Sequence, residues 1–327
     1  MAAMLLLLFC ITTTSCESVY EDLDPCISGV RLRFVYDYNM EFANAFPSQV
    51  DCLTLLIYDG NGKYLATRTA TRPDTSDPDW RMILDLPEGS YKMLAYGGID
   101  CADASFSFTS DPATTPMKDM EVRLNPDLLT GETGHALHHL YYGALDLSVP
   151  KPTNNGYTDA TIYMMKDTND VRIILANENG LPTDAADFDF SIISDNTLMN
   201  YENDLLPTSL TTYRPFAQGN MEVGLNEEDA PAVMAYAELS TSRFVYNNPT
   251  TLLITRKSDG NEVVRIPLLN ILMLYKSDRY RTMPAQEFLD RESRWNITFF
   301  LTNESLWVRT KIVVNDWTVR MNYISEM

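Results

Sequence analysis

Residues 29–38 have the sequence Gly-Val-Arg-Leu-Arg-Phe-Val-Tyr-Asp-Tyr, and this stretch decides the fold class. From Val30 to Tyr38, apolar and aromatic residues occupy every second position, and the positions between them are mainly charged. In an extended chain this period of two puts the apolar side chains on one face. The pattern therefore predicts a β-strand with one face in a core and the other in water.

The same pattern recurs through the first half of the chain, with turn sequences between the repeats. A strand predicted at Val50–Tyr58 ends in residues 59–62, Asp-Gly-Asn-Gly, which supply the positive-φ positions of a tight hairpin. Further strands are predicted at Met82–Leu86, Tyr91–Ala95, Ser105–Thr109, Met120–Leu124 and Leu140–Leu147. Many short strands separated by turns are typical of a β-sandwich, which we expect over residues 27–150.

A second sandwich is expected at residues 157–327. Residues 150–156, Pro-Lys-Pro-Thr-Asn-Asn-Gly, break regular structure and are predicted to be the linker. Strands are predicted at Ala160–Met165, Val171–Ala176, Phe188–Ile193, Val233–Leu239, Thr251–Thr255, Glu262–Ile266, Trp295–Leu301 and Trp307–Val314. Helical spacing of apolar residues predicts a helix around Leu268–Tyr280, and a helical turn is expected near Ala285–Glu292. The predicted fold is mainly β, with one or two short helices in the second sandwich.

The first sixteen residues predict export. Met4–Phe9 is almost purely apolar and far shorter than the roughly 20 residues of a membrane-spanning helix, which is typical of a signal peptide. Small polar residues then lead to Cys16, an arrangement that resembles the bacterial lipobox, in which the cysteine thiol receives lipid. We therefore expect residues 1–16 to be a lipoprotein signal peptide, with Cys16 the lipid-bearing residue. The alternative is an ordinary cleaved signal with an incidental cysteine.

An acidic segment follows Cys16. Glu17, Glu21, Asp22 and Asp24 lie within eight residues, and this composition predicts a linker, which we place at residues 17–26. Directly behind a lipidated cysteine, such a segment resembles the surface-export signal of Bacteroidetes lipoproteins. The plain alternative is a flexible acidic tether.

Three cysteines remain once Cys10 leaves with the signal peptide and Cys16 carries lipid. An exported protein can hold disulfides, and three thiols permit at most one bridge within the chain. Cys26 opens the first strand and Cys101 follows a later one, so we expect a Cys26–Cys101 bridge. Cys52 lies inside a predicted strand and is expected to be a small core residue.

The composition limits the partners. The chain has 327 residues and a net charge of -20. A polyanion repels the phosphates of nucleic acids and anionic lipid head groups, so neither is an expected partner. Three of the four tryptophans lie between Trp295 and Trp317, where we expect them to fill a core edge rather than a ligand platform.

Motif inspection predicts neither catalysis nor a cofactor. The histidines are His135, His138 and His139, but the glycines beside them favour a loop and the cluster lacks the glutamate of a zinc-protease motif. No nucleophile elbow, phosphate-binding loop or dinucleotide fingerprint is present in the sequence. No Cys/His spacing predicts a metal site. We therefore expect a protein that is not an enzyme and that binds no metal or cofactor.

Several short segments, in order, resemble one protein family. They are residues 29–40 after Cys26, Leu55–Asp59, residues 86–98, Leu140–Gly143, Lys166–Asn169, Met283–Arg291, Ile297–Leu301 and Val314–Trp317. They are similar to the fimbrillin-A-associated anchor proteins of Bacteroidia type V pili. The resemblance implies two transthyretin-like β-sandwich domains and a lipid tether in the outer membrane. It also implies a place at the base of the pilus, where pilin subunits of the shaft are the partners and shaft length is limited.

A joint between subunits is expected at a sheet edge. An open edge can accept a strand from a neighbouring subunit, and the β-rich terminus at residues 307–327 is the region we expect to form that joint. Two other classes remain open. A glycan-binding or adhesive surface lipoprotein predicts exposed aromatic residues on one face, and a hydrolase predicts a deep pocket with paired carboxylates.

Overall fold

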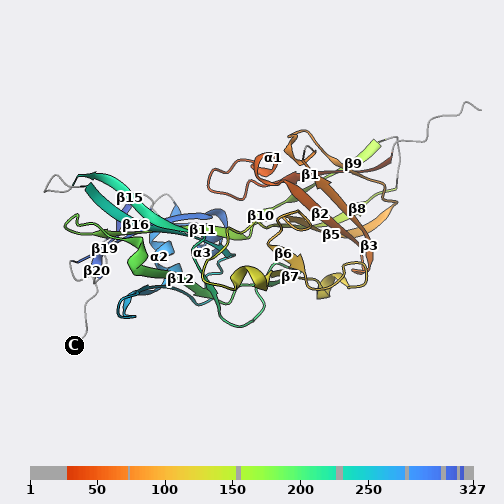
Figure 1. The fold of residues 1–327 in the computed structure, drawn as a ribbon. Coiled ribbons are helices and arrows are strands. Elements are labelled where there is room, and N and C mark those ends of the chain that lie inside the picture. Colours follow the sequence, from red (N-terminus) through yellow and green to blue (C-terminus); the bar gives the residue numbers. More distant parts are fainter. Residues whose placement is uncertain are drawn as a thin grey trace, which may run out of the picture.

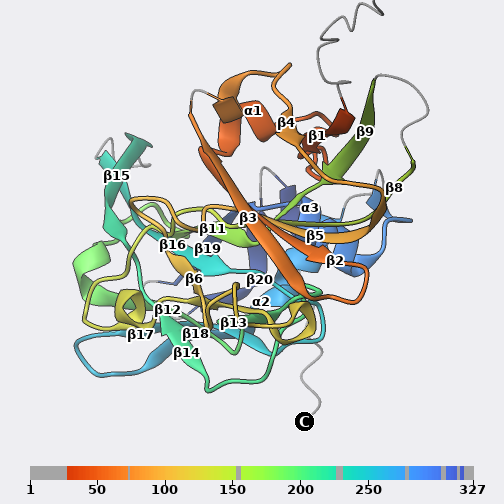
Figure 2. The same cartoon turned by 90° about the vertical axis from the view of Figure 1, so that its right-hand side faces the viewer.

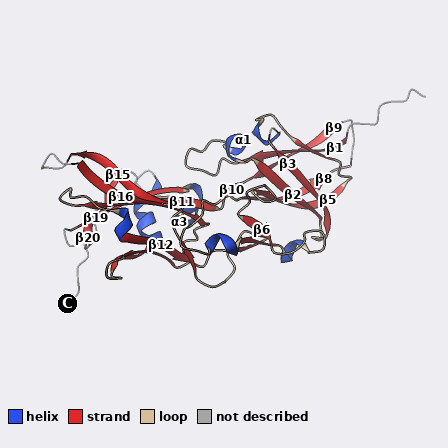
Figure 3. Cartoon of the chain, in the orientation of Figure 1, coloured by secondary structure: helices blue, strands red, loops and turns tan. Residues whose placement is uncertain are grey.

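The computed structural model describes residues 28–72, 74–151, 156–225, 231–276, 280–302, 307–314 and 317–319. The molecule is elongated and mainly β, with two sandwiches placed end to end and a few short helices (Figures 1 and 3). The described α-helices are α1 (Phe46–Gln49), α2 (Leu268–Leu272) and α3 (Ala285–Arg291). Among the described residues, none of the helices has the length and apolar character needed to cross a bilayer.

The first sandwich consists of a three-stranded and a five-stranded sheet. The order in the first sheet is β4 (Met82–Leu84), β1 (Ser28–Val35), β9 (Gly156–Tyr163). The order in the second is β10 (Met165–Lys166), β8 (Tyr141–Val149), β5 (Gly89–Gly97), β2 (Cys52–Asp59), β3 (Tyr64–Thr71). Val30, Leu32 and Phe34 of β1 are buried against Leu55 of β2, while Arg31 is exposed, as the alternation predicts.

The predicted boundary between the sandwiches was wrong. β9 pairs with β1 in parallel over eight residues, from Ser28↔Gly156 to Val35↔Tyr163, so residues 157–163 belong to the first sandwich. The segment at 150–156 carries the chain from β8 in one sheet to β9 in the other. Proline and asparagine mark a loop, but they do not reveal whether the loop joins two domains or two sheets. The chain enters the second sandwich after Lys166.

The second sandwich packs a six-stranded sheet against a four-stranded one. The order in the larger sheet is β15 (Ala217–Leu225), β16 (Pro231–Ser242), β11 (Thr168–Asn177), β19 (Arg294–Leu301), β20 (Trp307–Val314), β21 (Trp317–Val319). The order in the smaller is β14 (Thr211–Tyr213), β12 (Phe188–Ser194), β17 (Thr250–Arg256), β18 (Glu262–Pro267). The predicted C-terminal strands are confirmed by β19 and β20. The helix predicted at 268–280 is shorter than expected, because α2 passes into a 3-10 turn at Met273–Tyr275, whereas α3 confirms the second helical prediction.

A third sheet joins the two halves. Its order is β13 (Leu198–Asn200), β7 (Glu121–Leu124), β6 (Phe106–Phe108), and β13 comes from the second half of the chain. Leu56 and Leu94 point away from the first sandwich core and pack in the same buried cluster as Ile173 of β11. The view in Figure 2 shows β6 and β13 below the first sandwich, beside β12 and β14. The two sandwiches therefore pack against each other through apolar side chains and are not independent domains.

Candidate functional site

The two ends of the described chain lie at opposite ends of the molecule. β1 begins at the end of the first sandwich that is remote from the second, and β20 lies at the far end of the second sandwich (Figure 1). Cys16 and the predicted acidic tether at residues 17–26 lie outside the described residues, so lipidation stays a prediction.

A buried ion network fixes the chain where it crosses between the sandwiches. Arg243, which follows β16, donates from Nε and Nη2 to the two carboxylate oxygens of Asp290 in α3, at 2.9 and 3.0 Å. Its Nε also lies 3.8 Å from Asp167, which is fully buried at the crossing and accepts from Asn203 at 2.9 Å. Burial raises the pKa of Asp167 to about 7, because the carboxylate loses its hydration. The Arg243–Asp290 ion pair and the neighbouring Asp167 hold α3 in one position relative to the crossing segment, the stretch around Asp167 where the chain passes between the sandwiches.

Arg291 of α3 packs against the loop that follows β1 in the first sandwich. Its guanidinium lies 4.1 Å from the ring centre of Tyr38 and 4.6 Å from that of Phe42. Nη1 donates to the backbone carbonyls of Asp37 and Asn39 at 3.3 and 3.4 Å. The loop after β1 is thus held by a helix of the second sandwich. Together with the ion network, this contact connects the two sandwiches at several points.

The histidines lie on a loop, as the sequence predicts, but they do not act together. His135 is exposed, whereas His138 faces Asp51, with 3.1 Å between Nε2 and Oδ2. His139 Nδ1 forms a hydrogen bond with the Thr168 hydroxyl, at 3.0 Å. Burial, with a contribution from nearby Lys166, lowers the pKa of His139 to about 4, so this side chain is neutral at physiological pH.

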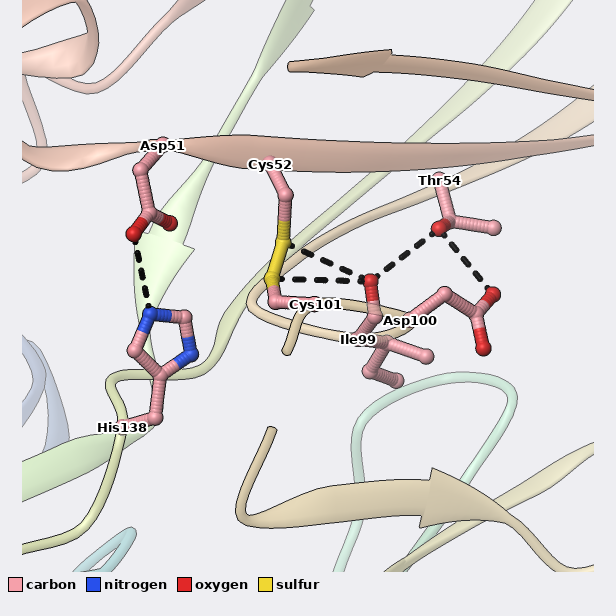
Figure 4. Close-up of a disulfide and its surroundings, with 7 residues drawn as sticks. All are labelled: Asp51, Cys52, Thr54, Ile99, Asp100, Cys101 and His138. Carbon is pink, nitrogen blue, oxygen red and sulfur yellow. Dashed lines mark hydrogen bonds and ion pairs between the residues drawn. A yellow bond between two sulfur atoms is a disulfide. The ribbon is translucent and has the colours of Figure 1, made fainter. Parts of the chain in front are cut away.

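The predicted Cys26–Cys101 bridge was wrong, because Cys101 forms a disulfide with Cys52. The Cα atoms of Cys52 and Cys101 lie 6.0 Å apart, within the usual range for a disulfide (Figure 4). β5 runs antiparallel to β2 and pairs Gly97 with Leu53, so the residues just beyond β5 return to the start of β2. Cys26 lies outside the described residues. Cys52 is buried, as expected, but it is half of the disulfide and not an unbridged core residue.

Gly98 allows this corner to close. Its φ is +88°, and a Cβ built there would lie 2.0 Å from the backbone oxygen of His139. Only glycine tolerates both the positive φ and this approach of two backbones. The loop that carries His138 therefore lies directly against the turn that carries Cys101.

An open groove borders the outer part of the second sandwich. β14 pairs with β12 only over Ile192–Ser194, so within the described part of the chain Phe188–Ser191 have no neighbouring strand on that side. A cavity of about 820 Å³ lies there. Its lining includes Asp189, Ser191, Arg214, Phe216, Gln218 and Lys257. A strand edge beside a cavity offers backbone hydrogen-bonding groups to an extended partner.

The buried carboxylates have a structural role. Asp167 and Asp290 both face Arg243 and are almost inaccessible to solvent, so a substrate could not reach them. Trp295 is buried as well, and its Nε1 donates to Asn169 Oδ1 at 3.0 Å. This agrees with the prediction that Trp295 fills a core. The side chains of Trp307 and Trp317 lie outside the described part of the structure.

A model of the fimbrillin-A-associated anchor proteins Mfa1 and Mfa2 matches residues 23–323. This chain belongs to that family. Membership gives it a fimbria-associated role at the cell surface and places it in a structural family, not a known family of enzymes. The sequence resemblance to the anchor proteins is thereby confirmed.

Solved structures of related proteins share the whole fold. A candidate adhesin from Bacteroides thetaiotaomicron is 47% identical, with a TM-score of 0.86 over 92% of this chain and all of that one. A candidate polysaccharide-binding protein from the same organism is 30% identical, with a TM-score of 0.78 over 91% of this chain and all of that one. The fimbrial anchor protein Mfa2 from Porphyromonas gingivalis is 17% identical, with a TM-score of 0.66 over 91% of this chain and all of that one, and shares the fold. No curated protein matches the chain.

Proposed function

We propose that this protein is a lipid-anchored outer-membrane subunit at the base of a type V pilus, where it attaches the shaft and limits its length. The observation that carries the proposal is the placement of the chain ends in a member of the anchor family. The segment that would bear the lipid precedes β1 at one end, and the C-terminal strands β20 and β21 lie at the other. An anchor needs this separation, because it must bind the membrane and the shaft at the same time.

The lipid tether is tested by changing Cys16. Two acyl chains give stable membrane attachment, because each buried CH₂ contributes about 0.8 kcal/mol. In Cys16→Ala we expect the protein to leave the membrane fraction and to lose the acyl mass of its N-terminal peptide, whereas Cys26→Ser should keep both. A Cys16→Ala protein that stays in the detergent-extracted outer membrane would refute lipid anchoring.

The joint with the shaft is expected at the C-terminal strands. β20 pairs with β19, and β21 pairs with β20 over Trp317–Val319, so the terminus extends the six-stranded sheet of the protein itself. Deleting residues 307–327 would therefore leave an edge of β19 unpaired and would destabilise the sandwich. Deleting only residues 320–327 leaves every described strand in place and is the sharper test of this region.

We expect cells with the 320–327 deletion to release pili into the medium while the thermal midpoint of the purified protein stays unchanged. Shaft subunit in the medium and pili on cells, counted by electron microscopy, are the readouts. A second variant, Asp189→Trp, places a large side chain at an exposed position that lines the open groove of β12, and it tests that edge as the rival joint. If both folded variants retain pili, the joint lies at neither edge.

Limitation of shaft length is tested in cells. A base subunit that ends assembly stops growth when it joins the shaft, so cells without it should carry or shed longer pili. We expect the length distribution to shorten again as the protein is supplied at increasing levels. An unchanged distribution would leave attachment in place but remove length control from the proposal.

The alternative function is glycan binding or adhesion. Two observations favour it: the description of the 30%-identical relative as a candidate polysaccharide-binding protein, and the cavity beside Phe216, Arg214 and Asp189. Titration with surface polysaccharides, compared between wild type and Arg214→Ala, tests it. Saturable binding that the substitution abolishes would favour the alternative, and no binding would favour the anchor.

A further inference from the structure

Three side chains of types that can bind a metal meet at the disulfide. His138 Nε2 lies 3.1 Å from Asp51 Oδ2. One ligand atom from each of Asp51, Cys101 and His138 lies within 4.8 Å of the other two. Figure 4 shows the imidazole and the carboxylate facing each other beside the two sulfurs. Asp51 directly precedes Cys52 in the sequence, which brings a second sulfur to the same corner.

The backbone at this corner is held by hydrogen bonds that do not involve the sulfurs. Arg72 N donates to Asp51 O at 3.1 Å, and Gly98 N donates to Cys52 O at 3.2 Å. His138 N donates to the Ser105 hydroxyl at 2.7 Å. The three segments that carry the four side chains are therefore positioned before any metal binds, which is the condition for a pre-organised site.

We propose that Asp51, Cys52, Cys101 and His138 form a Zn²⁺ site when the Cys52–Cys101 disulfide is reduced. Two sulfurs, one imidazole nitrogen and one carboxylate oxygen make up the four-coordinate set that zinc prefers. Thiolates favour zinc over magnesium or calcium, which take oxygen ligands. Bond lengths of about 2.0–2.3 Å put neighbouring ligand atoms about 3.3–3.8 Å apart. After reduction the two sulfurs therefore have to separate, while the Cys101 sulfur stays close to the imidazole and the carboxylate, with which it lies within 4.8 Å.

The redox step is balanced by an external dithiol. The dithiol gives two electrons and two protons to the disulfide, which becomes the thiols of Cys52 and Cys101, and the dithiol becomes a cyclic disulfide. Zn²⁺ then displaces the two thiol protons and bonds to both thiolates. In the oxidised protein both sulfurs are occupied by their mutual bond, and only Asp51 and His138 can reach a metal. The corner is thus cross-linked in either state, covalently or through zinc.

The test uses the full chain with Cys10, Cys16 and Cys26 changed to serine, so that Cys52 and Cys101 are the only cysteines. The protein is reduced with a dithiol, freed of reductant without oxygen, and titrated with Zn²⁺ by calorimetry and with Co²⁺ by absorption spectroscopy. We expect one equivalent to bind at least 100-fold more tightly than to the oxidised protein. Thiolate-to-cobalt charge-transfer bands should appear only in the reduced protein.

The substitutions separate this site from general metal binding. Asp51→Asn and His138→Ala should each weaken Zn²⁺ binding by at least tenfold, and His135→Ala, on the same loop but exposed, should have no effect. Equal affinity in all three variants would overturn the proposal, as would a reduced protein that binds no zinc. A reduced protein that loses its β-sheet circular dichroism and does not recover it with Zn²⁺ would overturn it too.

Discussion

Arg243 and Asp290 form a two-point ion pair in which each carboxylate oxygen receives one guanidinium N–H, at 2.9 and 3.0 Å. Both side chains are largely buried. Breaking such a pair leaves a charge without a partner, which typically costs about 3–5 kcal/mol. We expect Arg243→Met to lower the free energy of unfolding by that amount, measured by urea denaturation.

The matched control is Arg265→Met. Arg265 makes an equally close pair with Glu262, at 2.7 Å, but both groups are exposed to water. Its replacement should barely move the urea midpoint. Similar losses in the two variants would mean that burial does not set the strength of the Arg243 pair.

The second prediction concerns pH. The folded protein holds the Asp167 proton up to about pH 7, while the unfolded chain releases it near pH 4. The folded state therefore binds more protons in this window, and the Asp167 contribution to stability falls as pH rises from about 4 to about 7. Asp167→Asn removes this loss. Between about pH 4 and pH 7 we therefore expect the free energy of unfolding of the variant to rise relative to that of wild type by up to about 1.4 kcal/mol for each pH unit.

The difference between variant and wild type is the quantity to measure. His139, whose pKa burial lowers to about 4, titrates with the opposite sign, because its neutral form is favoured in the folded state. Its contribution to stability is lost as pH falls from about 6.5 toward 4 and cancels in the comparison. A difference that stays constant from pH 4 to 8 would show that Asp167 is ionised throughout.

The third prediction separates the two disulfide pairings. The Cys52–Cys101 bridge closes a loop with a sequence separation of 49, and chain entropy predicts a stabilisation of about 4 kcal/mol for a loop of this size. The double change Cys52→Ser with Cys101→Ser should lower the unfolding midpoint accordingly, while Cys26→Ser should not. Non-reducing peptide mapping that finds Cys26 joined to Cys101 would contradict the structure.

The fourth prediction concerns the contact between Arg291 and the loop after β1. Arg291→Lys keeps the charge but loses the planar group that lies over Tyr38 and Phe42. We expect amide exchange in residues 36–44 to quicken by about tenfold, the equivalent of about 1.4 kcal/mol. Arg31→Lys, whose partner Tyr157 lies on the exposed side of the first sandwich, is the control and should leave this loop unchanged.

The sequence identified strands better than it identified their partners. The alternation in β1 and the apolar positions of β19 reflect local burial, so both strands were predictable. Pairing of β9 with β1 depends on contacts between residues more than a hundred positions apart, which periodicity does not record. The disulfide had a usable signal, since a chain that leaves β5 must return beside the start of an antiparallel β2. Recognising it required knowing that β2 and β5 are neighbours.

The same limit applies to the sites. Asp51, Cys101 and His138 carry no recognisable motif because three separate segments bring them together. The Arg243 network was equally hidden, since its members come from the residue after β16, from α3 and from the crossing segment. The groove at β12 exists because β14 is short and the chain leaves the sheet at Arg214. Chain geometry creates each of these features, and composition gave no sign of them.

The position of β1 has a mechanical consequence. β1 lies between β4 and β9, and its parallel ladder with β9 covers all eight residues from Ser28 to Val35. A pull on Ser28 directed away from the second sandwich acts along the strand, so it shears the ladder and loads its hydrogen bonds simultaneously. Bonds loaded together resist extension far better than bonds opened one after another. The first strand of the fold is therefore placed to withstand tension at the N-terminal end.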